Sequence, residues 1–218
     1  MKVKVTKNGP YIVSGEVPLD EIKITKDGNE YKYLKSKDFD EGKKYFLCRC
    51  GKSKDKPFCD GTHAKEGFDG TCKSTEIKFE DNIKKYENDF LILLDNEDLC
   101  SSARFCTTDE TDIWELVEEN KEENNEQIKE MAFNCPSGRL VVIEKGNTLE
   151  PELENKISII QDEHKKCGSA IYVQGDIEIL DENDEPYENR NRTTLCRCGK
   201  SKNKPYCDGS HIKENFQG

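Results

Sequence analysis

The sequence predicts an α+β fold in which two small β-rich units form an intramolecular pseudo-dimer and a small α+β domain lies between them. Two observations predict this arrangement. The stretch Leu47–His63 recurs almost unchanged as Leu195–His211. The segment between the two copies has a different apolar pattern, with short runs and helical spacing. We therefore expect three domains, at residues 1–75, 76–149 and 150–218.

Each repeated unit begins with a short run of β-branched and aromatic residues around a glycine. These runs are Tyr11–Val17 and Ile171–Ile177, and their composition predicts strands in which the glycine marks a bulge or a close backbone approach. The first copy is longer, and its Asp-Gly within Lys26–Asn29 predicts a hairpin turn. A short helix is expected after each copy, at 64–67 and 212–215. Two such units in one chain favour packing about a pseudo-two-fold axis.

The middle segment combines two predicted strands with two predicted helices. Phe90–Leu94 and Leu140–Ile143 are short apolar runs typical of buried strands. Ile113–Val117 has apolar residues on one helical face, and a charged helix is expected over Asn124–Phe133. The acidic run Glu118–Glu126 is interpreted as a solvated loop and helix start.

Composition limits the class of protein. The net charge of −11 argues against a nucleic-acid partner, because such proteins present a basic face. No apolar stretch reaches the length of a membrane span, and Met1–Asn8 lacks the apolar core of a secretory signal. We therefore expect a cytoplasmic protein. In a reducing compartment, eleven cysteines indicate metal or redox sites and not disulfides.

The repeated stretch carries the same four soft ligands in each copy, spaced as Cys-x-Cys-x8-Cys-x3-His. The ligand sets are Cys48, Cys50, Cys59 and His63, and then Cys196, Cys198, Cys207 and His211. Spacing alone leaves two interpretations open. Three cysteines and a histidine are a common structural zinc set, although zinc fingers usually place two residues between paired ligands.

The other interpretation is a 2Fe-2S cluster, with Cys48 and Cys50 on one iron and Cys59 and His63 on the second. The surroundings favour this anionic cluster. Basic residues surround the loop in an otherwise acidic protein, and two glycines allow backbone N–H groups to approach sulfides. These residues are Arg49, Lys52, Lys54 and Lys56, with Gly51 and Gly61.

The full pattern, Cys-x-Cys-x2-Ser-x3-Pro-x-Cys-Asp-Gly-(Ser/Thr)-His, resembles that of the CDGSH iron–sulfur family, the mitoNEET-like proteins. This resemblance implies one 2Fe-2S cluster per copy, with the Cys-x-Cys thiolates on the inner irons and Cys59/His63 and Cys207/His211 on the outer ones. The chain departs from the membrane-anchored members, since it lacks an anchor helix and carries both motifs. The further residues assigned to cofactor binding are Gly51, Ser53, Pro57, Asp60, Gly61, Gly199, Ser201, Pro205, Asp208 and Gly209.

The histidine ligand has two expected consequences. A neutral imidazole in place of a thiolate raises the reduction potential relative to all-cysteine clusters. Imidazole also competes with protons for the metal, so acid is expected to release the clusters.

The middle segment contains a third candidate set, Cys100, Cys106 and Cys135. Bacterial ferredoxins use Cys-x2-Cys-x2-Cys with a distant Cys-Pro. Here Cys135-Pro136 supplies the distant pair, and Ala103 replaces the middle cysteine. The segment is similar to a divergent single-cluster ferredoxin domain. Three thiolates favour a 3Fe-4S cluster. A 4Fe-4S cluster needs a fourth ligand, from Cys72, Cys167 or a non-protein group. The alternative is three cysteines without a cluster.

No phosphate-binding glycine loop and no nucleophile–base pattern is present in the sequence, so we do not expect an enzyme. The first functional hypothesis is an electron-transfer protein, a monomer with internal pseudo-two-fold symmetry that meets a redox partner protein. The second is a 2Fe-2S cluster storage or transfer protein that meets an apo-acceptor protein. The third is a structural zinc-binding interaction module.

Overall fold

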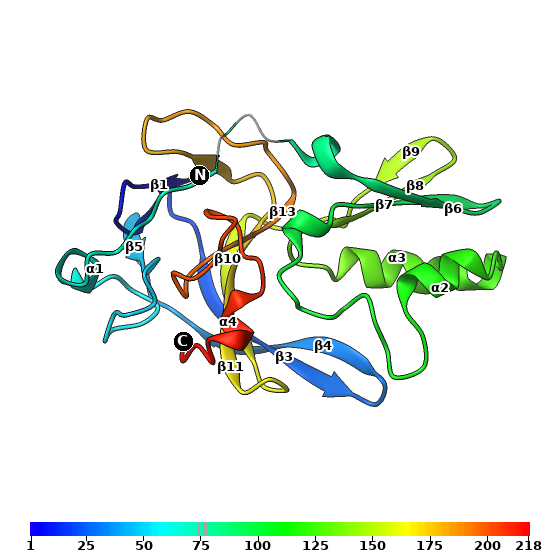
Figure 1. The fold of residues 1–218 in the computed structure, drawn as a ribbon, viewed down its shortest axis with the longest axis horizontal. Coiled ribbons are helices and arrows are strands. Elements are labelled where there is room, and N and C mark those ends of the chain that lie inside the picture. Colours follow the sequence, from blue (N-terminus) through cyan, green and yellow to red (C-terminus); the bar gives the residue numbers. More distant parts are fainter. Residues whose placement is uncertain (74, 76–77) are drawn as a thin grey trace.

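Three β-sheets organise the residues that the computed structural model describes, which are 1–73, 75 and 78–218 (Figure 1). The strands in chain order are β1 (Lys2–Val5), β2 (Tyr11–Ser14), β3 (Leu19–Asp27), β4 (Glu30–Asp38), β5 (Lys44–Leu47), β6 (Lys84–Glu87), β7 (Leu91–Asp95), β8 (Leu140–Glu144), β9 (Asn147–Leu149), β10 (Lys156–Asp162), β11 (Cys167–Gln174), β12 (Glu178–Leu180) and β13 (Arg192–Leu195). The sheet orders are β12-β1-β2-β5, β13-β11-β10-β3-β4 and β6-β7-β8-β9.

The two repeated units exchange strands. β1 and β2 form an antiparallel pair in the first unit, as β10 and β11 do in the second. β3 then leaves the first unit and pairs in parallel with β10, with Leu19 opposite Ile157. β12 leaves the second unit and pairs in parallel with β1, with Lys2 opposite Glu178. This reciprocal exchange confirms the intramolecular pseudo-dimer.

Both units contribute to one apolar core. Alternate residues of β1 and β2 point inward, as the period-two pattern of a strand requires. They meet the inward residues of β10 and β11 in a single cluster that includes Val3, Val13, Ile159 and Ile171. Full burial of each such side chain contributes about 1.5–3 kcal/mol. Because the core is shared, neither unit has a complete core of its own.

The middle segment folds as a small α+β domain with its own core. The helices α2 (Ile113–Glu118) and α3 (Asn125–Phe133) lie alongside the third sheet (Figure 1). Their buried face meets Leu93 of β7 and Val142 of β8. Asp112 caps α2, since its Oδ1 accepts hydrogen bonds from the N–H groups of Trp114 (3.0 Å) and Glu115 (2.9 Å). All four predicted elements of this segment are confirmed.

Short helices complete the fold. They are α1 (Thr62–Lys65) and α4 (Ser210–Lys213), with 3₁₀ turns at Phe79–Asn82, Glu97–Leu99 and Glu122–Asn124. Among the described residues, no helix has the length and apolarity needed to cross a membrane.

Two local expectations need correction. The predicted strands do not run through Gly15 and Gly175, because β2 and β11 end one residue earlier. Both glycines have positive φ angles, 101° and 75°, which turn the chain and favour glycine. The helices after the ligand loops also begin earlier than expected, so each includes its ligand histidine. The hairpin turn at 26–29 is confirmed between β3 and β4.

The boundary expected between residues 75 and 76 falls beside residues 74 and 76–77, which lie outside the described part of the chain. This domain boundary stays a prediction.

Candidate metal centres

The two repeated ligand sets have the same local geometry. Cys48 Sγ lies 3.7 Å from Cys50 Sγ, and Cys59 Sγ lies 3.3 Å from His63 Nδ1. The corresponding distances in the second copy are also 3.7 Å and 3.3 Å. In each loop the N–H of the first cysteine donates a 2.8 Å hydrogen bond to the carbonyl of the loop proline. The loop therefore holds a thiol pair and a thiol–imidazole pair.

This pairing bears on the two metal interpretations. A structural zinc ion needs four ligands around one point. A two-iron cluster instead needs one pair of ligands for each iron. The thiol pair and the thiol–imidazole pair of each loop fit that requirement of a 2Fe-2S cluster.

Asp60 and Asp208 hold the loops in shape. Asp60 Oδ2 accepts a hydrogen bond from the Lys54 N–H, and its Oδ1 accepts one from the Thr62 N–H, both at 2.9 Å. These two donors hold the pKa of the Asp60 carboxyl well below its usual range. Asp208 accepts the equivalent bonds from backbone N–H groups at 2.8 and 3.0 Å. Each aspartate thus joins the loop to the helix that carries the histidine.

The predicted serines also support the loops from within. Ser53 and Ser201 are buried, and each Oγ accepts a hydrogen bond from the N–H two residues later, at 3.0 and 2.9 Å. Pro57 and Pro205 are buried and follow cis peptide bonds. These four residues shape the loops.

Gly51 and Gly199 bring the two ligand loops together. Their φ angles are 74° and 76°. A Cβ at Gly51 would lie 2.6 Å from the carbonyl oxygen of Cys198, and one at Gly199 would lie 2.6 Å from that of Cys50. The sequence assigns these glycines to cofactor binding and does not predict the contact between the two loops. A sequence signal for that contact exists, because a glycine follows Cys-x-Cys in both copies.

Arg49, one of the cations expected around the first loop, directs its side chain to backbone carbonyls. Its guanidinium is buried and donates to the carbonyl oxygens of Thr6 (2.5 Å) and Gly9 (3.3 Å). Lys52 forms an exposed ion pair with Glu66 at 2.5 Å. Arg49 therefore braces the backbone around the first site, since unpaired carbonyls in a buried loop are costly.

The two CDGSH sites differ in exposure. His211 is 1% exposed and Cys207 is 2% exposed, whereas His63 and Cys59 are half-buried. His211 Nε2 lies 3.2 Å from Ser169 Oγ, and burial lowers the pKa of this imidazole to about 4. Burial also raises the pKa of the Cys207 thiol. Equivalent ligands thus meet different surroundings.

The three middle cysteines lie at the edge of the middle domain's core. Cys106 and Cys135 pack against the buried cluster there, and all three are half-buried. Burial raises the pKa of Cys106 to about 12, and the nearby thiols of Cys135 and Cys100 add to that rise, while Arg139 opposes it. The sulfurs therefore share one small region, with a cation close by.

Ala103, at the position of the missing ligand, has another role. It is 6% exposed and packs with Ile24 and Tyr172 of the repeated units. Cys72 Sγ lies 3.2 Å from an Arg49 nitrogen, and Cys167 begins β11. Both cysteines thus belong to the repeated units, and these positions do not favour either one as a fourth ligand to the middle site.

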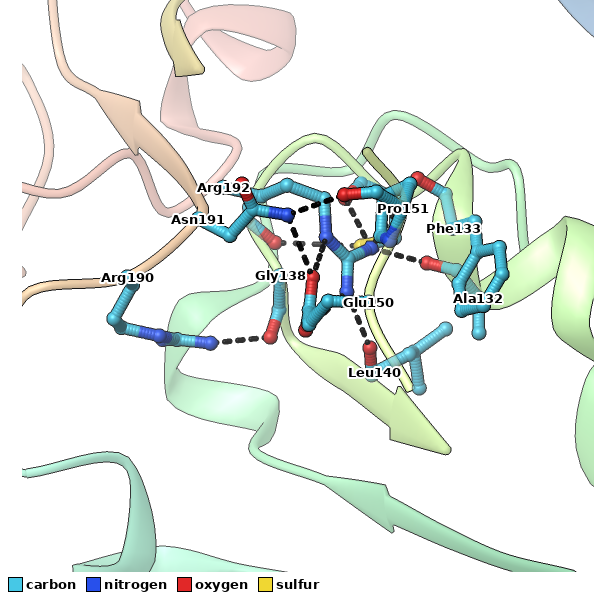
Figure 2. A network of polar contacts seen from close by, with 11 residues as sticks. Ala132, Phe133, Gly138, Leu140, Glu150, Pro151, Arg190, Asn191 and Arg192 are labelled. Carbon is cyan, nitrogen blue, oxygen red and sulfur yellow. Dashed lines mark hydrogen bonds and ion pairs between the residues drawn. The ribbon is translucent and has the colours of Figure 1, made fainter. Parts of the chain in front are cut away.

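Arg192 joins the middle site to the second repeated site (Figure 2). It begins β13, the strand that leads into Cys196, and its side chain is fully buried. The guanidinium donates to the carbonyl oxygens of Cys135 and Leu140, both at 3.1 Å, and also to that of Ala132. It forms an ion pair with Glu150 at 2.8 Å. One side chain therefore holds the Cys135 loop against the strand of the second site.

The middle domain also contacts the second ligand loop directly. Asn203 Nδ2 donates a 2.8 Å hydrogen bond to the carbonyl of Asp98. A Cβ at Gly209 would lie 2.3 Å from Ser102 Oγ, so the segment after Cys100 touches the loop that carries Cys207. Together with the contact at Gly51 and Gly199, this brings the three ligand loops into successive contact.

Comparison with protein families agrees with this geometry. The model described as "Iron-binding zinc finger CDGSH type" matches residues 8–64 and 169–212. The model described as "Divergent 4Fe-4S mono-cluster" matches residues 86–145. No curated protein and no solved structure matches the chain.

The fold and the ligand sets thus define an iron–sulfur protein. The chain contains two regions of the CDGSH iron-binding type, residues 8–64 and 169–212, and the region between them matches the divergent mono-cluster model.

Proposed function

We propose that the protein transfers single electrons and carries three iron–sulfur clusters. The observation that supports this is the successive contact of the three ligand loops, at Gly209 with Ser102 and at Gly51 with Cys198. Iron–sulfur clusters supply one-electron chemistry, and the protein tunes it through ligands, hydrogen bonds and burial. A redox chain needs its cofactors close together, and loops in contact favour that arrangement.

The proposed cofactors are a 2Fe-2S cluster in each CDGSH site and a 4Fe-4S cluster in the middle site. The description of the middle family supports four irons over three, in contrast to the 3Fe-4S cluster that three cysteines favour. The fourth iron then takes a ligand other than cysteine. We keep 3Fe-4S as the alternative for this site.

Cluster content is tested on recombinant protein made without oxygen. We expect a red-brown protein with about eight irons and eight sulfides per chain, the sum of two 2Fe-2S clusters and one 4Fe-4S cluster. EPR of the oxidised and reduced states separates a 3Fe-4S from a 4Fe-4S cluster. A colourless protein that contains zinc contradicts the proposal and supports the zinc-binding module.

Cluster transfer is the second candidate function, because Cys59 and His63 are only half-buried. Incubation with an apo-ferredoxin distinguishes the two functions. Reversible reduction with all clusters retained supports electron transfer, and appearance of a cluster on the apo-ferredoxin supports donation.

The remaining features of the proposal concern setting and partners. We propose a monomer, without enzymatic activity, that works in the cytoplasm with a redox partner or an apo-acceptor protein and without nucleic acid or membrane. Analytical ultracentrifugation of the holoprotein tests the monomer.

A further inference from the structure

We infer that the two CDGSH sites have different roles. The first is an open site that gives its 2Fe-2S cluster to an acceptor protein, and the second is closed by residues 100–104 of the middle domain and keeps its cluster. This inference rests on the proposed 2Fe-2S cluster in each CDGSH site and, for the first site, on cluster transfer, the second candidate function.

The ligands on the outer side of each site provide the first argument. Cys59 and Cys207 occupy the same place in the repeat, as do His63 and His211. In the first copy both side chains are half-buried, whereas Cys207 is 2% exposed and His211 is 1% exposed. The loops themselves are built alike, so the difference comes from their neighbours, which in the second copy are Ser169 of β11 beside His211 and the segment around Ser102 beside Gly209.

A pair of equivalent glycines identifies the cover. Gly61 and Gly209 have φ angles of 83° and 79°. Among the described residues, no heavy atom lies within 4 Å of a Cβ built at Gly61. A Cβ built at Gly209 would lie 2.3 Å from Ser102 Oγ. The segment around Ser102 therefore rests on the second loop, and the equivalent position of the first loop is open.

The cover is held in place by buried polar contacts. An Arg104 nitrogen lies 2.9 Å from the Asp162 carboxylate, which is 1% exposed. Arg104 also donates a 2.9 Å hydrogen bond to the carbonyl of Ser102. Ser102 and Arg104 have φ angles of 60° and 69°, which residues with a side chain adopt only when their surroundings impose them. The cover is thus a fixed part of the fold.

The positions of α1 and α4 in the fold agree with different roles for the two CDGSH sites. In Figure 1, α1 lies at one end of the long axis of the molecule. α4 lies near the centre, between α1 and the middle domain. An acceptor protein can approach α1 and His63 without displacing another domain, but it reaches His211 only after the cover opens.

Transfer at the open site is a ligand exchange with no net oxidation. The cluster is the cargo: its bonds to Cys48, Cys50, Cys59 and His63 break, and bonds to four ligands of the acceptor form. Three protons pass from the acceptor's thiols to the three released cysteines, because cysteine binds metal as thiolate, and the proton of a fourth acceptor thiol goes to solvent. The half-buried Cys59 and His63 are the ligands that the acceptor can displace first.

The test uses holoprotein with counted iron and sulfide, mixed with an excess of apo-ferredoxin or, separately, of EDTA. We expect two phases of loss of 2Fe-2S absorbance, with the slow phase about tenfold or more slower, because a covered site reacts only while it is locally open. The His63→Cys variant should slow the fast phase, and the His211→Cys variant should leave it unchanged. A single phase, or a fast phase that responds to His211→Cys, overturns the inference.

The cover is tested by a matched pair of substitutions. Gly209→Ala and Gly61→Ala impose the same backbone strain at equivalent positions, but only Gly209→Ala pushes against Ser102. Gly209→Ala should therefore accelerate the slow phase toward the fast one, and Gly61→Ala should not change the slow phase.

A second variant leaves both ligand loops intact. Arg104→Gln removes the charge that pairs with Asp162, and it should also accelerate the slow phase. If neither Gly209→Ala nor Arg104→Gln changes the slow phase, the inference is wrong. Failure of the proposed function is a separate outcome, since it would show as zinc in place of iron or as clusters that cannot be reversibly reduced.

Discussion

At the scale of single residues, the ligand histidines show how surroundings change an equivalent group. Protonated imidazole cannot bind iron, so protons compete with the metal at His63 and His211. His211 is almost fully buried, and burial lowers its pKa to about 4 from its ordinary value of 6.5. A proton therefore competes with iron for His211 only at a lower pH than it would for an imidazole with the ordinary pKa.

The first prediction is that the half-buried first site loses its cluster at a higher pH than the second as the solution is acidified. Acid titration followed by visible absorbance should show two transitions. His63→Cys should remove the transition at higher pH and lower the potential of that cluster, because thiolate replaces a neutral ligand. Unchanged acid lability in this variant would mean that His63 is not a ligand.

A second prediction concerns Asp60, whose two carboxylate oxygens each accept one backbone N–H. Asp60→Asn keeps one acceptor and Asp60→Ala keeps none. Cluster loss to EDTA should therefore accelerate in the order wild type, Asn, Ala. Equal rates in all three proteins would show that the loop keeps its shape without this side chain.

At the scale of elements, the end of α3 and the start of β13 are joined through Arg192. The guanidinium donates to the carbonyls of Ala132 at the end of the helix and of Cys135 in the following loop, each of which also accepts a backbone N–H. Arg139 and Asp95 form a second buried ion pair beside the same site. The middle ligand set thus depends on contacts that no single element contains.

The third prediction is that Arg192→Met destabilises the protein by about 1.5–3 kcal/mol, because it removes a fully buried charged donor to the carbonyls of Cys135 and Leu140. Denaturant unfolding measures this change, and iron counts should show that the middle cluster is lost first. Lys32→Ala is the control, since it removes only an exposed ion pair with Asp27, which water screens. A similar small effect at Arg192 would contradict the proposed coupling.

At the scale of the whole molecule, the two repeated units behave as one. They exchange β3 and β12, share a core, and meet at Gly51 and Gly199. A change at this contact is therefore felt at both CDGSH sites.

The fourth prediction is that Gly51→Ala lowers cluster occupancy in both CDGSH sites. The left-handed conformation costs alanine about 1 kcal/mol relative to glycine, and the added Cβ also collides with the Cys198 carbonyl. Gly28→Ala is the matched control, because its φ is 60° and a Cβ there meets no described heavy atom within 4 Å. Iron counts and urea unfolding compare the two variants. Equal effects would show that the contact between the two loops does not affect cluster occupancy.

The sequence alone predicts the ligand sets, the internal repeat, the resemblance to a family and four elements of the middle domain, but not β6 and β9. These features depend on local patterns: ligand spacing such as Cys48 to His63, apolar periodicity, and turn residues such as Asp27-Gly28. Such patterns are readable because each is determined by residues that are close in the chain.

Only the tertiary structure decides that His63 and His211 differ in exposure and that Arg49 donates to backbone carbonyls. It also decides that Ala103 packs in a core. Each depends on residues distant in the chain, such as Ser102 against Gly209 or Ile24 against Ala103. Two copies of one motif carry the same local information, and they become different sites because burial and contact are properties of the folded whole.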